Sequence, residues 1–157
     1  MLFRSPVFSN ISRSENTHLN AVIWLLKNYG EEYTAVEEAG KFTNPDFQDL
    51  YDKLVAKGSV SLAEALKTGA FIEDLDIKDL MDYIGRVSNE NIIMVFENLT
   101  KGSRNHLRAF NRILVRMGIT YTPSYISQEE FDKIISSPHE RSEEHTSELK
   151  SPNTISY

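Results

Sequence analysis

Residues 11–29 read ISRSENTHLNAVIWLLKNY and have the pattern of an amphipathic helix. Steps of four and three residues define its largely apolar stripe, which consists of Ile11, Glu15, His18, Val22, Leu25 and Tyr29. Glu15 and His18 occupy the middle of this stripe. Because burying a charge is costly, such groups are normally neutralised, paired or bound to a metal. The stretch therefore predicts a helix with a polar site on its core-facing side.

Two further stretches show the same irregularity. One stripe consists of Ala63, Leu66, Ala70, Glu73, Ile77, Leu80 and Ile84. Glu73 is its ionisable member, and Asp76 lies one turn further on, beside the same face. The other carries His106 and consists of Ile92, Phe96, Leu99, Ser103, His106, Phe110, Ile113 and Met117. If the three helices pack together, the ionisable groups converge: Glu15, His18, Glu73, Asp76 and His106. This convergence predicts a shared metal site, and the alternative is a set of separate structural hydrogen bonds.

Composition limits the classes of protein to consider. The 157 residues fit one domain with a real core. The absence of cysteine excludes disulfides and thiolate metal sites. A net charge of −6 argues against general nucleic-acid binding. No apolar run approaches the roughly 20 residues of a membrane span, and the first ten residues lack the apolar region of a signal peptide. We expect no membrane partner, and the compartment stays open between cytoplasm and export.

One basic cluster runs against this acidic balance. Its members are spaced by three or four residues on the last long helical stretch: Lys101, Arg104, Arg108, Arg112 and Arg116. That spacing places them on one face of a helix. The pattern favours a solvated helix face over a binding surface.

Both ends of the chain resemble translated sequencing adapters. Residues 141–157 read RSEEHTSELKSPNTISY, close to the in-frame translation RSEEHTSELQS of a common short-read adapter, with Lys150 in place of Gln. Residues 1–5 read MLFRS, and the opposite adapter translates to a run ending in TLFRS. We therefore expect an artefact at 1–5, a natural domain at 6–136 and a disordered, largely artefactual tail at 137–157.

The natural part of the chain reads as all-α. Capping residues, glycines and stripes predict three long and two short helices, over Ser9 or Ser12 to Tyr29, Pro45 to Gly58, Leu62 to about Val87, Ser88 or Asn89 to Gly118, and Ser127 to Ile135. A four-helix bundle needs four long faces. We therefore expect an up-down bundle that lacks its first long helix, with an exposed apolar groove that favours a homodimer.

Four segments resemble an uncharacterised prokaryotic ferritin-like family, domain of unknown function 2202. The resemblance runs from about Phe8 to Phe131, and the segments are FSNISRSENTHLNAVIWLLKNYG, GKFTNPDFQDLYDKLVAKGS, EALKTGAFIEDLDIKDL and ENLTKGSRNHLRAF. It implies a ferritin-like bundle able to hold a di-iron centre, whose superfamily pattern is a lone Glu on two helices and Glu-x-x-His on two others.

The resemblance assigns ligands residue by residue. Glu15 and His18 match the first Glu-x-x-His, Glu73 matches a lone Glu, and His106 matches the second histidine. Ser103 stands where the second motif has Glu, and the helix with the other lone Glu is absent. Asp76, one turn from Glu73, is the candidate to replace a carboxylate.

The function these residues favour is metal binding at an incomplete site. The expected cofactor is iron, as one ion or two, with manganese or zinc as alternatives. If the intact parent is an enzyme, it is an iron-dependent oxidase or peroxidase; it could also store or sense metal. Two other classes stay open: a phosphotransfer or interaction module using an exposed His106, and a structural bundle without metal.

Overall fold

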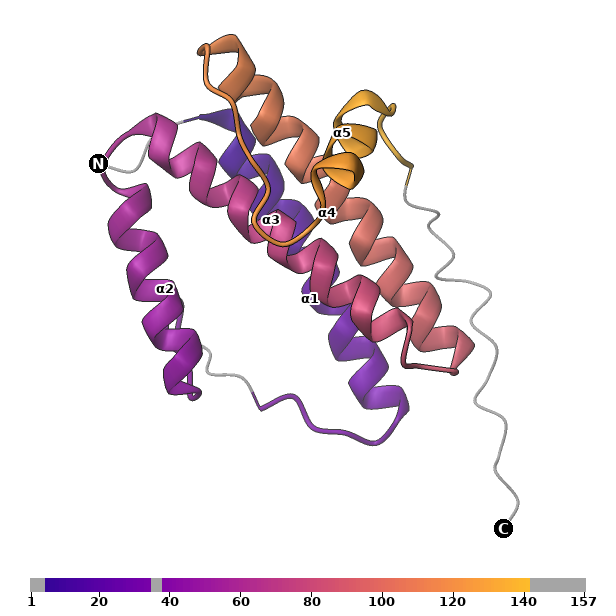
Figure 1. Cartoon of the computed structure of the whole chain (residues 1–157). Helices are drawn as coiled ribbons and strands as arrows, with labels where there is room; N and C mark the ends of the chain where they lie inside the picture. The colour runs from indigo at the N-terminus through magenta and orange to yellow at the C-terminus, as the bar shows by residue number, and fades with distance from the viewer. Residues whose placement is uncertain (1–4, 35–37, 142–157) are drawn as a thin grey trace.

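The computed structural model describes residues 5–34 and 38–141. In this part of the chain the secondary structure consists of helices joined by loops, without strands. Three long and two short helices occur in it: α1 (Pro6–Asn28), α2 (Pro45–Gly58), α3 (Leu62–Ile84), α4 (Glu90–Arg116) and α5 (Gln128–Ser136) (Figure 1). The predicted all-α class and the set of helices are confirmed. The adapter-like residues 1–4 and 142–157 lie outside the described residues.

Most helices begin where the sequence places a capping side chain. Side-chain oxygens accept hydrogen bonds from first-turn N–H groups at four starts, from Asn44, Ser61, Asn89 and Ser127. The start of α1 differs from the prediction, because it begins at Pro6 after Ser5. Proline suits the first helical position, where its missing N–H costs nothing. The end of α3 also differs from the prediction. This helix stops at Ile84, whereas the sequence predicted an end near Val87.

The core lies between α3 and α4, which run antiparallel along most of their length (Figure 1). Fully buried Leu66 and Ile77 of α3 face Leu107 and Leu114 of α4. Gly69 permits this approach, since a Cβ there would lie under 3.0 Å from the ring of Phe110.

The loop between α4 and α5 is anchored by Asp74 of α3, which is fully buried. Its carboxylate accepts hydrogen bonds from the Tyr121 hydroxyl at 3.0 Å and from the backbone N–H groups of Ser124, Tyr125 and Ile126. These bonds hold the loop across α3, as Figure 1 shows. The apolar stripe of this helix does not mark Asp74, since this residue lies beside the stripe that contains Glu73.

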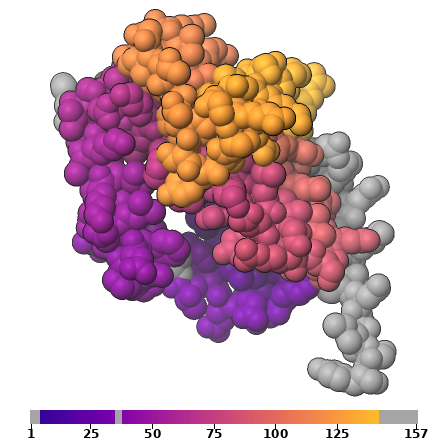
Figure 2. All heavy atoms as spheres, in the orientation of Figure 1, coloured from indigo at the N-terminus to yellow at the C-terminus, as the bar shows by residue number. Residues whose placement is uncertain are grey.

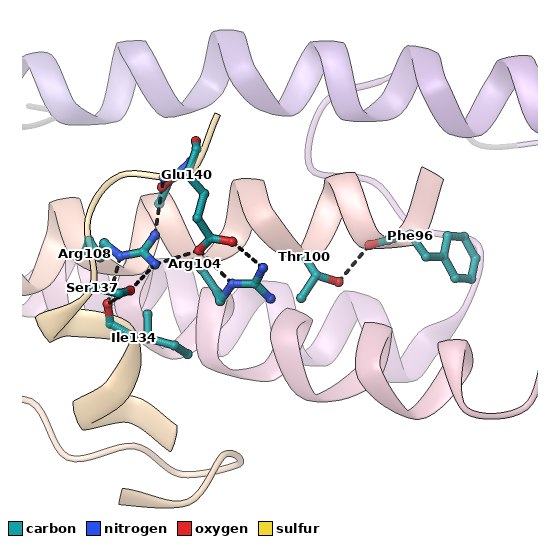
Figure 3. Close-up of polar contacts among 8 residues, drawn as sticks. Phe96, Thr100, Arg104, Arg108, Ile134, Ser137 and Glu140 are labelled. Carbon is teal, nitrogen blue, oxygen red and sulfur yellow. Dashed lines mark hydrogen bonds and ion pairs between the residues drawn. The ribbon is translucent and has the colours of Figure 1, made fainter. Parts of the chain in front are cut away.

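Arginines of α4 hold the segment that follows α5 (Figure 3). Arg104 Nε and Arg108 Nη2 donate to Glu140 Oε1 at 2.8 and 2.6 Å, and Arg108 Nε donates to the Ile134 carbonyl at 2.8 Å. The hydrogen bonds with Arg104, reinforced by Arg108, lower the pKa of Glu140 to about 2. Arg104 and Arg108 thus pack against the C-terminal segment of the same chain instead of facing solvent alone.

A groove separates α2 from the other helices, and Figure 2 shows the hollow beside α2. This α2 groove has a volume of about 1050 Å³. Its lining includes Phe8, Ile11, Glu15, Tyr51, Leu54, Val55, Thr68, Ile72, Glu73, Asp76 and Phe110. The backbone of α2 contacts α3, and the backbone of α1 contacts α4. Within the described structure, α2 has no buried residue. An amphipathic helix is thus left without a full partner.

Among the residues that the structure describes, no helix is both long and apolar enough to cross a membrane.

Candidate metal centre

Three helices bring a carboxylate or an imidazole to one point between α1, α3 and α4. His106 Nδ1 lies 2.9 Å from Glu15 Oε1 and 3.3 Å from Glu73 Oε1. One ligand atom from each of the three residues falls within 4.8 Å of the other two. Each side chain sits at the predicted mid-stripe position of its helix, and the expected convergence of these three residues is therefore observed.

The helix packing that creates this point depends on a glycine. His18 of α1 lies against Gly102 of α4, where a Cβ would approach the imidazole to under 3.0 Å. α1 therefore packs close to α4 at the level of the site. The apolar stripes of the sequence do not mark Gly102, although its place one turn before His106 and next to Ser103 is a usable signal.

Two buried atoms of the cluster lack a hydrogen bond. His106 is 7% exposed and Glu73 is 4% exposed. Within the described residues, His106 Nδ1 and Glu73 Oε2 have no hydrogen-bond partner of acceptable geometry, although Nδ1 lies within ion-pair distance of both carboxylates. A buried polar atom left unpaired normally costs about 1–3 kcal/mol. Such atoms are expected where something else, such as a metal ion, binds.

The three groups perturb one another's ionisation. Burial opposes a charge on Glu15, but contacts with His106 and His18 outweigh it and lower its pKa to about 2. Burial opposes a charge on His106 as well, yet contacts with Glu15 and Glu73 raise its pKa to about 9. At Glu73 burial dominates and raises the pKa. Without a metal, the site is thus an imidazolium between two acidic side chains.

The other two predicted ligands lie beside this cluster. His18 Nδ1 is 3.2 Å from Glu15 Oε2, and the ring centres of His18 and His106 are 5.6 Å apart. Asp76 is half-buried and lines the α2 groove. Burial, together with the charges of Glu73 and Glu15, raises the pKa of Asp76 to about 7. Both residues are neighbours of the three-residue cluster rather than members of it.

Comparison with known proteins places the chain. The family model described as "Uncharacterized protein domain (DUF2202)" matches residues 2–138. The chain belongs to this family. A relative, "Uncharacterized protein MJ0754" of Methanocaldococcus jannaschii, is 53% identical over 140 residues, which are 88% of this chain and 76% of that protein.

A solved structure agrees with the fold described above. The crystal structure of hypothetical protein MJ0754 from Methanococcus jannaschii superposes with a TM-score of 0.84 at 51% identity. The match covers 88% of this chain and 79% of the solved chain. The helical arrangement is thus shared with a relative of known structure.

Proposed function

We propose that this DUF2202 domain binds a divalent first-row transition metal, with iron the leading candidate, through Glu15, Glu73 and His106. The observation that carries the proposal is the place of His106 Nδ1, buried, without a hydrogen bond among the described residues, and 2.9 and 3.3 Å from two carboxylate oxygens. Mixed carboxylate and imidazole ligands suit iron and manganese, and zinc also accepts them.

The distances fit a shared ion. Nitrogen and oxygen ligands lie about 2.0–2.2 Å from a metal such as zinc. Two ligands at that distance, separated by 90–110° at the metal, are roughly 2.8–3.6 Å apart. The two His106 distances, 2.9 and 3.3 Å, fall in this range. A metal would replace the proton that the raised pKa of His106 otherwise retains.

The residues around the cluster have supporting roles in this proposal. His18 contacts the second oxygen of Glu15 and holds that carboxylate toward His106. Asp76, half-buried beside the groove, is available as a further carboxylate ligand for one ion or for a second. Bound iron would supply one-electron redox chemistry, which makes the intact parent a candidate oxidase or peroxidase; storage or sensing of metal needs only the binding itself.

We infer that the parent is a ferritin-like four-helix bundle whose site is incomplete here. Thr68 Oγ1 and Glu73 Oε2 are buried, belong to residues that line the α2 groove, and have no hydrogen-bond partner within the described chain. A further amphipathic helix in this groove would cover the apolar residues of α2 and α3. A carboxylate on that helix would complete the ligand set of a ferritin-like centre. The match with this chain covers 76% of the M. jannaschii protein.

The burial of His106 disfavours the phosphotransfer alternative. Phosphoryl transfer between proteins needs an accessible imidazole, whereas His106 is 7% exposed and faces two acidic side chains. A structural bundle without metal is the remaining alternative. In that case the imidazolium of His106, paired with Glu15 and Glu73, would be the whole role of the cluster.

Equilibrium dialysis of the chain against Fe(II) under anaerobic conditions, with Mn(II) and Zn(II) in parallel, tests the proposal. Glu73→Gln removes a charged ligand with little change in shape, and should weaken binding by at least about tenfold. Glu97→Gln on the exposed face of α4 is the matched control and should bind like the parent chain.

Equal binding by Glu73→Gln and the parent would overturn the metal assignment, as would no binding by either. The structural alternative makes its own prediction for metal-free protein. The pKa of His106 is raised from 6.5 to about 9. Stability from its ion pairs would then be complete below pH 6.5 and lost as the pH rises through about 9.

A further inference from the structure

A second groove lies on the other side of α1, away from α2. This α4 groove has a volume of about 980 Å³ and runs between the start of α1, the C-terminal half of α4 and the segment after α5. Apolar and basic residues share its lining, among them Pro6, Val7, Arg112, Ile113, Arg116 and His139. Its volume is at the upper end of those of small-molecule sites, about 300–1,000 Å³.

The basic residues of the groove continue the α4 face that holds Glu140. Arg104 and Arg108 already bind that carboxylate (Figure 3). Arg112 and Arg116 follow at intervals of four residues and have no ion pair or hydrogen bond with any described residue. A guanidinium presents several donors that match a carboxylate or phosphate. Two arginines of this row therefore bind a carboxylate, and Arg112 and Arg116 have no partner among the described residues.

A polar side chain of the same groove also has no protein partner among the described residues. Asn111 is 9% exposed, lines the groove, and its side-chain amide makes no hydrogen bond with the residues that the structure describes. Its polar atoms reach the solvent of the groove, so the amide is available to a polar atom of a ligand. This observation is independent of the arginines and points to a polar ligand atom next to them.

We propose that the α4 groove binds a small organic carboxylate with an apolar tail. The carboxylate would lie at Arg112 and Arg116, with the Asn111 amide as an additional partner, as Glu140 lies at Arg104 and Arg108. The tail would lie on the apolar residues at the start of α1 and on Ile113. An anion without a tail would leave this apolar wall in water and gain nothing from it.

The groove also reaches the proposed metal centre, since His106 is part of its lining. Carboxylate binding to the arginines does not require a metal, however, so the inference stands apart from the proposed function. Its test therefore uses chelator-treated protein.

Calorimetric titration of the chain with octanoate tests the proposal, with acetate, octanol and inorganic phosphate as comparison probes. We expect saturable octanoate binding that exceeds binding of all three. The double variant Arg112→Gln/Arg116→Gln should bind octanoate at least about tenfold more weakly, because loss of a charged hydrogen bond typically costs more than 1.4 kcal/mol. Arg86→Gln, which changes an exposed arginine outside the groove, should leave binding unchanged.

Asn111 provides a second readout that does not depend on the arginines. Its side-chain amide resonances should shift on octanoate addition and stay in place with octanol. The proposal is overturned if octanoate fails to bind up to about 5 mM, if the double variant binds like Arg86→Gln, or if octanol or phosphate binds as well as octanoate. Circular dichroism of each variant checks that the helices are intact.

Discussion

The imidazole of His18 on α1 lies against the backbone of Gly102 on α4, in space that any other residue's Cβ would occupy. Gly69 of α3 stands in the same relation to Phe110 of α4. The two contacted rings differ in how deeply they are buried. His18 is at the edge of the bundle beside the candidate site, whereas Phe110 is 3% exposed within the core.

Gly69→Ala and Gly102→Ala should therefore have different effects. Alanine favours a helix over glycine by about 1 kcal/mol at either position. At Gly69 the added Cβ meets the ring of Phe110, which is 3% exposed, and overpacking of about 1–3 kcal/mol should outweigh this gain and lower stability. At Gly102 the His18 ring can turn aside, so stability should change by less than about 1 kcal/mol. Urea unfolding measures both changes.

The same two variants distinguish a change in core packing from a change at the candidate metal site. Because His18 must move in Gly102→Ala, its NMR resonances and those of His106 should shift more than in Gly69→Ala. A large loss of stability in Gly102→Ala with unmoved histidine resonances would contradict the described packing of α1 on α4.

Asp74→Asn should be among the most damaging single changes in the chain. The carboxylate accepts hydrogen bonds from the Tyr121 hydroxyl and from three consecutive backbone N–H groups. Asparagine would turn an NH₂ group toward some of these donors, at a cost of about 2–4 kcal/mol. The free energy of unfolding in urea measures this loss. Asp79→Asn, an exposed change on the same helix, should cost less than about 0.5 kcal/mol.

Acid should weaken the contact between α4 and the C-terminal segment. The arginines lower the pKa of Glu140 from 4.5 to about 2. Since the folded-state pKa is depressed, this contribution is complete above pH 4.5 and is lost as the pH falls toward 2. Glu140→Gln should remove roughly 1–3 kcal/mol near neutral pH and flatten this part of the stability–pH curve. Denaturant unfolding between pH 2 and 6 checks it; parallel curves for the two proteins would refute the contact.

The exposed α2 groove should cause self-association. Its apolar residues include Val55 and Ile72, which are 46% and 38% exposed. We expect concentration-dependent dimers or larger species in sedimentation velocity, and a shift to monomer in Val55→Glu/Ile72→Glu. Val60→Glu changes a residue that is 75% exposed and lies outside the groove, and should leave association unchanged. A parent chain that stays monomeric at high concentration would contradict this prediction.

The sequence by itself determined the helices and what each one presents. Capping residues such as Ser61 and Asn89 act on N–H groups two or three residues away, so helix starts are local properties. The three- and four-residue periodicity likewise placed Glu15, Glu73 and His106 at mid-stripe.

Only the tertiary structure decided which of these groups meet. The stagger and rotation of α1, α3 and α4 bring His106 between Glu15 and Glu73, and leave His18 and Asp76 beside them. A one-turn sliding of one helix, about 5.4 Å, would exchange such neighbours without changing any local pattern. For the same reason the sequence did not reveal that Arg104 and Arg108 hold Glu140, 36 and 32 residues away.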